Sequence, residues 1–121
     1  MKADRFIQKS IEYSGYDYKT HEILSQFYLL KRQFDKAIIE GKKAVDLNPS
    51  SASSNFVYGM ILSLATRYDE AIPALKKAIR LNPIQPINYL NQLAFAYSYT
   101  KQYEKAISLW EQTIKRNPDY Y

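Results

Sequence analysis

Apolar residues recur mostly at spacings of three and four in three similar segments, residues 34–49, 68–83 and 103–118. In the middle segment, YDEAIPALKKAIRLNP, the apolar stripe consists of Tyr68, Ala71, Ile72, Leu75, Ala78, Ile79 and Leu81. This spacing lines one face of a helix. Acidic residues near the start and basic residues near the end suit the helix dipole, and the closing Asn-Pro ends the helix because proline disfavours an α conformation in the residue before it. The pattern therefore predicts an amphipathic helix in each segment.

A second helical pattern precedes each of these segments, at residues 19–31, 53–65 and 87–100. The repeated segments start 34 and then 35 residues apart, and a fixed period of this size indicates stacked structural repeats. One helix hairpin cannot cover its own apolar face, whereas neighbouring hairpins cover one another. The sequence thus predicts three helix–turn–helix units in a linear stack.

The positions of small and large residues within each unit resemble those of the tetratricopeptide repeat family. Each first helix has a small residue followed three positions later by a large one, at Ser25 and Tyr28, Gly59 and Leu62, and Ala94 and Tyr97. Each second helix has an early alanine and a closing proline, namely Ala37 and Pro49, Ala71 and Pro83, and Ala106 and Pro118. The family's first-helix tryptophan is replaced by His21, Asn55 and Leu90. The resemblance implies an all-α fold, a right-handed α-solenoid of antiparallel helix hairpins with about seven helices.

The repeat register divides the chain into four segments of a single domain. Residues 1–17 are expected to form an N-terminal helix, either the second helix of a partial repeat or a cap. The complete units are expected at 18–51, 52–85 and 87–121, with Pro86 as a one-residue insertion between the last two. Arg116 stands where the earlier units have leucine, and its charge predicts fewer packing neighbours near the last repeat.

Composition narrows the function classes. Hydrophobic residues make up 46% of the 121 residues, which supports a buried core, and no apolar run reaches the length of a membrane span. We therefore expect no membrane insertion, and the lack of a signal-peptide pattern predicts a cytoplasmic location. The net charge of +5 is spread thinly along the chain, so no nucleic-acid binding is expected.

The tyrosines leave an RNA-binding helical repeat as an alternative, because aromatic and basic side chains together can stack bases. Their positions argue against it. Five of the twelve tyrosines fall on packing positions of the repeat and are expected in the core, namely Tyr28, Tyr58, Tyr68, Tyr97 and Tyr103. The lysine pairs at 42–43 and 76–77 lie on second helices, which form the outer wall in the family, so they are expected to be solvated.

No residue pattern points to catalysis. His21 is the single histidine and the chain has no cysteine, so no metal site is expected and His21 is assigned a structural or surface role. The sequence contains no nucleophile elbow, phosphate-binding loop or dinucleotide-binding glycine motif. We therefore expect a non-catalytic protein without cofactors.

The first helices line the concave face in tetratricopeptide repeat proteins, so the resemblance implies an inner surface built from three stripes. In the first unit the stripe is Lys19, Glu22, Ile23, Gln26 and Leu30, and in the second it includes Val57. Residues 52–66 and 86–100 contain no charged residue, which predicts an apolar or amphipathic ligand rather than an acidic one. The predicted peptide-binding residues are Phe56, Met60, Ser63, Leu64, Asn88, Asn91, Gln92, Phe95 and Tyr99.

Two features qualify this prediction. Phe56 and Phe95 have an alternative role in packing between neighbouring first helices. Some members of the family grip a peptide's terminal carboxylate with basic residues and asparagine, and Asn91 is the only partial match, so this form of binding is not expected.

The leading hypothesis is a non-catalytic protein–protein interaction module or scaffold that binds a peptide or partner helix in the concave groove. A second hypothesis is a regulatory or sensory domain of a larger signalling protein, cyclase-like or transcription-regulator-like. The stretch RLNPIQPINYL is similar to the loop between repeats in bacterial signalling proteins of this kind. End-to-end self-association is a further expectation, because repeat arrays leave their terminal faces uncovered.

Overall fold

The computed structural model describes residue 5, residues 8–9 and residues 17–116 of the chain. Residues 17–116 form six α-helices, α2 (Tyr18–Leu30), α3 (Phe34–Leu47), α4 (Ala52–Leu64), α5 (Tyr68–Leu81), α6 (Ile87–Tyr99) and α7 (Tyr103–Arg116). No strand occurs within these residues. The helix expected over residues 1–17 lies almost entirely outside the described residues.

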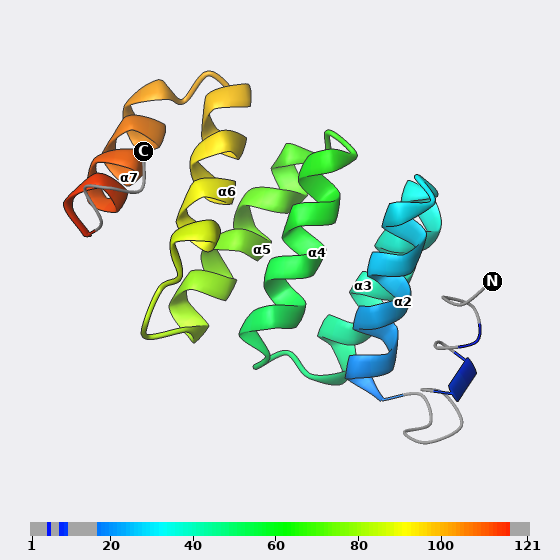
Figure 1. Ribbon diagram of the computed structural model, residues 1–121. Helices are drawn as coiled ribbons and strands as arrows, with labels where there is room; N and C mark the ends of the chain where they lie inside the picture. Colours follow the sequence, from blue (N-terminus) through cyan, green and yellow to red (C-terminus); the bar gives the residue numbers. More distant parts are fainter. Residues whose placement is uncertain (1–4, 6–7, 10–16, 117–121) are drawn as a thin grey trace.

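The six helices form three antiparallel hairpins, α2–α3, α4–α5 and α6–α7, that follow one another along the molecule. Helices α2, α4 and α6 lie side by side, α3 and α5 lie behind them, and α7 lies beside α6 at the end of the stack (Figure 1). Each second helix contacts the first helix of the next hairpin, α3 with α4 and α5 with α6. This arrangement confirms the prediction of an all-α solenoid of helix hairpins.

Small residues allow the helices of each hairpin to approach closely. Ala37, Ala71 and Ala106, the predicted early alanines of the second helices, are buried. Gly59 of α4 faces Leu75 of α5, and a Cβ atom at Gly59 would lie 2.8 Å from the Leu75 Cγ. Larger side chains at these positions would separate the helices, because protein interiors are close-packed.

The core consists of two clusters that join neighbouring hairpins. One cluster connects α3, α4 and α5 around Ile61 and Leu62, and the other connects α5, α6 and α7 around Leu75 and Leu93. Of the five tyrosines expected in the core, Tyr97 is buried and three are half-buried. The prediction for Tyr103 is wrong. This residue begins α7 at the end of the described stack, where no following helix covers it, and it is exposed.

The turn inside each hairpin repeats the same backbone conformation. Arg32, Thr66 and Lys101 occupy equivalent positions and have φ angles of 59°, 61° and 64°. In the second turn the Thr66 amide donates to the Ser63 carbonyl at 2.9 Å, and the next amide donates to the Leu62 carbonyl at 2.8 Å. This pair of hydrogen bonds is the Schellman motif, which ends a helix through a left-handed residue and is usually built with glycine.

The connection between the second and third hairpins differs from the connection before it. Four residues separate α3 from α4, whereas five residues, 82–86, separate α5 from α6. The Arg116 guanidinium reaches this loop, where Nη1 donates to the Gln85 carbonyl at 2.5 Å and Nη2 donates to the Ile84 carbonyl at 2.9 Å. Arg116 thus ties the end of α7 to the inter-repeat loop, a role that its predicted lack of packing neighbours did not suggest.

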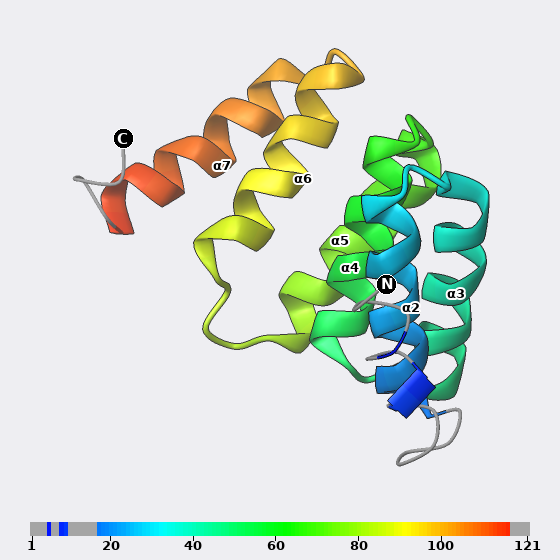
Figure 2. The ribbon, with the colours of Figure 1, turned by 45° about the vertical axis from the view of Figure 1, so that its right-hand side comes forward.

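The longer loop accompanies a looser inner contact between the last two hairpins. Helix α4 contacts α2 more extensively than it contacts α6. Figure 2 shows the α6–α7 hairpin inclined relative to the other two hairpins. The inner surface is therefore most open between α4 and α6.

Candidate functional site

The inner surface is the layer formed by α2, α4 and α6. Helices α4 and α6 carry no charged side chain. Lys19 and Glu22 of α2 are the only lysine, arginine or carboxylate residues on these three helices. The inner surface is thus nearly uncharged in a chain in which 24% of the residues are charged.

A pocket of about 310 Å³ opens on this surface between the C-terminal ends of α4 and α6. We call it the inter-repeat pocket, and its lining residues are Ser63, Leu64, Thr66, Tyr68, Gln92, Phe95, Ala96 and Tyr99. Five of the nine residues predicted from the sequence lie in this lining. The lining has no charged residue and is mainly apolar, which is typical of sites that bind an apolar group.

Aromatic contacts hold the walls of the inter-repeat pocket. Tyr99 of α6 stacks on Tyr68 of α5, with 5.6 Å between ring centroids and 19° between ring planes. Phe95 meets Trp110 of α7 edge to face, also with 5.6 Å between centroids. Tyr99 is nevertheless 67% exposed and Phe95 47% exposed. Each ring therefore has one side supported by the fold and another available to a ligand.

The other four predicted residues lie outside the pocket lining. Phe56 is half-buried and stacks on Tyr89 of α6, with 4.1 Å between ring centroids. Its ring therefore contributes to packing between α4 and α6, the alternative role that the sequence left open for it. Met60 and Asn91 are half-buried on the same helices, and Asn88 is exposed.

The inner stripe predicted for the second unit is wrong at one position. Val57 is buried and belongs to the core cluster that joins α3, α4 and α5. Helix α4 is covered on several sides, because it contacts α2, α3, α5 and α6. Without charged residues to mark the solvent side of α4, the sequence pattern does not separate Val57 from its inner-surface neighbours.

The sequence prediction missed three lining residues, Thr66, Tyr68 and Ala96. Thr66 belongs to the turn and Tyr68 begins the second helix of the same hairpin, so first-helix stripes alone omit both. The repeat pattern assigns Tyr68 to the core. The sequence does contain a signal that Tyr68 also lines the pocket. A tyrosine at the start of a second helix lies next to the hairpin turn, and this turn forms one end of the pocket.

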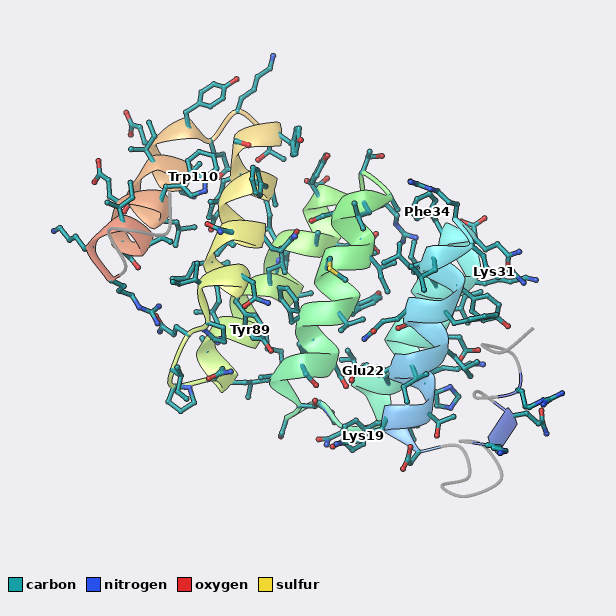
Figure 3. All side chains as sticks on the ribbon, in the orientation of Figure 1. Lys19, Glu22, Lys31, Phe34, Tyr89 and Trp110 are labelled. Carbon is teal, nitrogen blue, oxygen red and sulfur yellow. The ribbon has the colours of Figure 1, made fainter. Side chains whose placement is uncertain are left out.

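The opposite end of the inner surface is polar. One oxygen of the Glu22 carboxylate, Oε1, accepts hydrogen bonds from the Ser53 and Ser54 hydroxyls, each at 2.9 Å. Figure 3 shows Glu22 on the side of α2 that faces α4, with Tyr89 on α6 beyond it. Burial raises the pKa of the Tyr89 phenol above its ordinary value, a hydrogen bond with Asn82 opposes this shift, and the negative charge of Glu22 adds to it.

His21 lies beside Glu22 in sequence but has a different environment. Its Nδ1 is 2.5 Å from Oε2 of Glu40 on α3, and the His21 ring is buried. The contact joins the two helices of the first hairpin, in line with the structural role predicted for this residue. Across the residues that the structure describes, no group of three potential metal ligands occurs. In the same residues, no helix is long and apolar enough to cross a membrane.

Clefts of about 400 and 370 Å³ also occur at the hairpin turns. Residues 32–36 and 101–105 form these clefts, at equivalent positions in the first and third hairpins. Each is made by five consecutive residues and includes charged side chains. We attribute these clefts to the repeated turn geometry, whereas the inter-repeat pocket combines residues from two hairpins.

The stacked hairpins and the uncharged inner surface define a helical-repeat protein of the α-solenoid class. Sequence models described as tetratricopeptide repeat match residues 52–85 and 87–120, which together cover more than half of the chain. The chain belongs to the tetratricopeptide repeat family, whose members typically act as protein–protein interaction modules. A comparison with curated protein sequences gave no match.

Solved structures of tetratricopeptide repeat proteins resemble the whole stack. A crystal structure of MamA superimposes with a TM-score of 0.83 at 27% identity, covering 96% of this chain and 67% of MamA. YrrB, described as having an unusual peptide-binding site, gives a TM-score of 0.81 at 21% identity, covering 94% of this chain and 58% of YrrB. A thermophilic repeat protein from Thermus thermophilus gives 0.79 at 19% identity, covering 94% of this chain and 63% of that protein. The last two likenesses show the fold alone.

Proposed function

We propose that this chain is a non-catalytic interaction module that binds a peptide or a partner helix on its inner surface, with an apolar side chain of the partner in the inter-repeat pocket. The observation that carries the proposal is that apolar side chains of the pocket lining are exposed to solvent and are also held in place by contacts within the fold. Leu64, Phe95 and Tyr99 are exposed apolar side chains gathered around one hollow, and no charged residue interrupts them. Contiguous exposed apolar surface of this kind marks interaction sites in soluble proteins.

The size of the pocket suits a side chain of a polypeptide ligand. A volume of about 310 Å³ lies at the lower limit for small-molecule sites, which are usually about 300–1,000 Å³. Gln92, which is half-buried, adds a hydrogen-bonding amide group to the lining. Such a group can meet the backbone of a bound segment.

The inter-repeat pocket does not suit two other function classes. Among the described residues, the pocket lining contains no carboxylate, imidazole or amine that could serve as a general acid or base near neutral pH. Helices α4 and α6, which form the pocket walls, contain no lysine or arginine that could bind a nucleic-acid backbone.

A displayed library of random peptides, each about 12 residues long to match the reach of the groove, tests the proposal. Peptides selected on the protein should shift amide resonances of residues 60–66 and 92–99. Leu64→Ala should weaken their binding about five- to thirtyfold, because a buried leucine contributes about 1–2 kcal/mol when half of its surface becomes covered. Ile39→Ala is the matched control, because Ile39 on α3 has the same 54% exposure as Leu64 but lies outside the pocket. Selected peptides that map to α3, α5 and α7, with the inner surface unaffected, would contradict the proposal.

A further inference from the structure

Glu22 has the position and partners of a recognition group for a positive charge. Its Oε1 atom is held by two serine hydroxyls from the start of α4, and these bonds fix the carboxylate against the inner surface. Ser54, one of the two donors, is itself buried. The hydrogen bonds reduce the conformational freedom that a carboxylate would lose on binding a ligand.

No positive charge of the described chain neutralises this carboxylate. The ion pairs within residues 17–116 are His21 with Glu40, Lys42 with Asp46, Lys43 with Glu40, and Arg67 with Glu70. All of the acidic partners in these pairs lie on α3 or α5, in the layer behind the inner surface. Glu22 is thus the carboxylate of the inner surface, and it has hydroxyl partners but no cationic partner.

The electrostatic influence of Glu22 reaches Tyr89 on α6. Phe56 and Tyr89 stack on each other between α4 and α6, and the pKa of Tyr89 is raised mainly by burial and in part by the negative charge of Glu22. An electrostatic interaction close to partly buried apolar groups is screened less than one in open water. Lys19 lies one turn before Glu22 on α2, and its positive charge would repel a ligand cation that approaches Glu22.

We propose that the segment bound on the inner surface carries a lysine or arginine that pairs with Glu22 while an apolar side chain fills the inter-repeat pocket. This inference rests on the proposed function and adds the chemistry and the direction of the ligand. Charge complementarity supports it, because Glu22 offers an oriented carboxylate and α4 and α6 offer no competing charge. Charged groups in an interface contribute mainly to specificity and register.

Helix geometry sets the spacing between the two contacts. Ser54 and Leu64 are ten residues apart on α4, which corresponds to roughly 15 Å along the helix at about 1.5 Å per residue. Crossing from the α2 side to the α6 side adds lateral distance comparable to a helix spacing of about 8–10 Å, so the contacts lie roughly 15–20 Å apart. An extended segment covers this distance in about five or six residues.

The peptides selected from the random library test the inference directly. They should be enriched in lysine or arginine about five or six residues from an apolar residue. Replacing that lysine by acetyl-lysine should weaken binding to the parent protein about three- to tenfold, a range expected for a partly exposed ion pair with hydrogen bonds. Binding to Glu22→Gln should be insensitive to the same replacement, so that a double-mutant cycle isolates the pair.

Two matched variants separate a local pair from a change in net charge. Glu111→Gln removes one negative charge from an exposed position on α7 and should keep the full preference for lysine. Lys19→Gln should keep or increase that preference, because it removes the neighbouring positive charge. Thermal melting of each variant provides the stability control.

The outcomes distinguish the inference from the proposed function. Peptides that need Leu64 and Phe95 but bind equally in their lysine and acetyl-lysine forms overturn the Glu22 pairing and leave the interaction site intact. An equal loss of the lysine preference in Glu22→Gln and Glu111→Gln also overturns the pairing, because it indicates a net-charge effect. A selection that yields no inner-surface binder overturns the proposed function and the pairing together.

Discussion

At the scale of single residues, the two helical glycines differ in how much space surrounds them. A Cβ atom at Gly59 would approach the Leu75 Cγ to 2.8 Å and the Leu75 backbone nitrogen to 3.2 Å. A Cβ atom at Gly41 would meet the Tyr58 ring at 3.1 Å, and this ring is only half-buried and has room to move. The same substitution therefore has different consequences at the two positions.

We expect Gly59→Ala to destabilise the protein by about 1–3 kcal/mol, because overpacking of the α4–α5 contact exceeds the gain in helix propensity. Gly41→Ala should be neutral or stabilising by up to about 1 kcal/mol, since the propensity gain is opposed only by a small ring shift. Urea unfolding followed by circular dichroism measures both. Equal changes in the two variants would contradict the difference in packing.

Thr66 offers a second prediction at this scale. Its φ of 61° is unfavourable for a β-branched residue, whereas glycine adopts this conformation freely. We expect Thr66→Gly to raise the free energy of unfolding by about 1 kcal/mol. Lys101→Gly, at the equivalent turn, should give a smaller gain, because lysine is not branched at Cβ. A lower melting temperature for Thr66→Gly would show that the threonine side chain contributes more than its backbone strain costs.

At the scale of elements, Arg116 links the end of α7 to the loop at 82–86. Arg116→Ala should lower stability by about 0.5–1.5 kcal/mol and increase hydrogen exchange in α7 and in the loop, because two charge-assisted hydrogen bonds are lost. Arg116→Lys should recover only part of the effect, since an ammonium group cannot reproduce the guanidinium fork. Lys115→Ala, a neighbouring exposed position, is the control. Exchange rates that do not change in Arg116→Ala would mean that the loop holds its position without the tie.

The arrangement of the helices could be predicted from the sequence because the repeat period directly indicates stacked helix hairpins. The small residues at Ala37, Ala71 and Ala106 mark helix crossings, and the Asn-Pro pairs mark helix ends, so each helix predicted within residues 18–116 lies close to an observed one. The residues of the inner surface were harder to predict from the sequence. Val57 and Phe56 lie on an uncharged helix with neighbours on several sides, and no local signal divides its core positions from its exposed ones.

The inter-repeat pocket was predicted in part for a related reason. The first-helix stripe identified Leu64, Phe95 and Tyr99, because these are apolar residues on one face of their helices. Thr66 and Tyr68 join the pocket only through the turn between α4 and α5. Sequence periodicity describes one helix at a time and contains no information on how a turn closes a hollow between two hairpins.

At the scale of the whole molecule, equivalent residues have different environments according to their place in the array. Ile72 on α5 packs against the next hairpin, whereas its equivalent on α7, Ile107, is exposed. We expect Ile72→Ala to cost about 1–3 kcal/mol and Ile107→Ala less than about 0.5 kcal/mol. Thermal unfolding measures both. A large loss for Ile107→Ala would indicate that α7 is covered in solution, and the expected end-to-end self-association would then be examined by sedimentation at several concentrations.

The inter-repeat pocket has one wall on the α4–α5 hairpin and the other on the α6–α7 hairpin, and the five-residue loop is the covalent link between these two bodies. The width of the pocket therefore depends on the angle between the two hairpins. A rotation at the loop changes the distance between Leu64 on one wall and Tyr99 on the other. A ligand that grips both walls acts as a clamp on that angle. Ligand binding in the pocket would then change the distance between spectroscopic labels placed far from it, on the outer faces of α3 and α7.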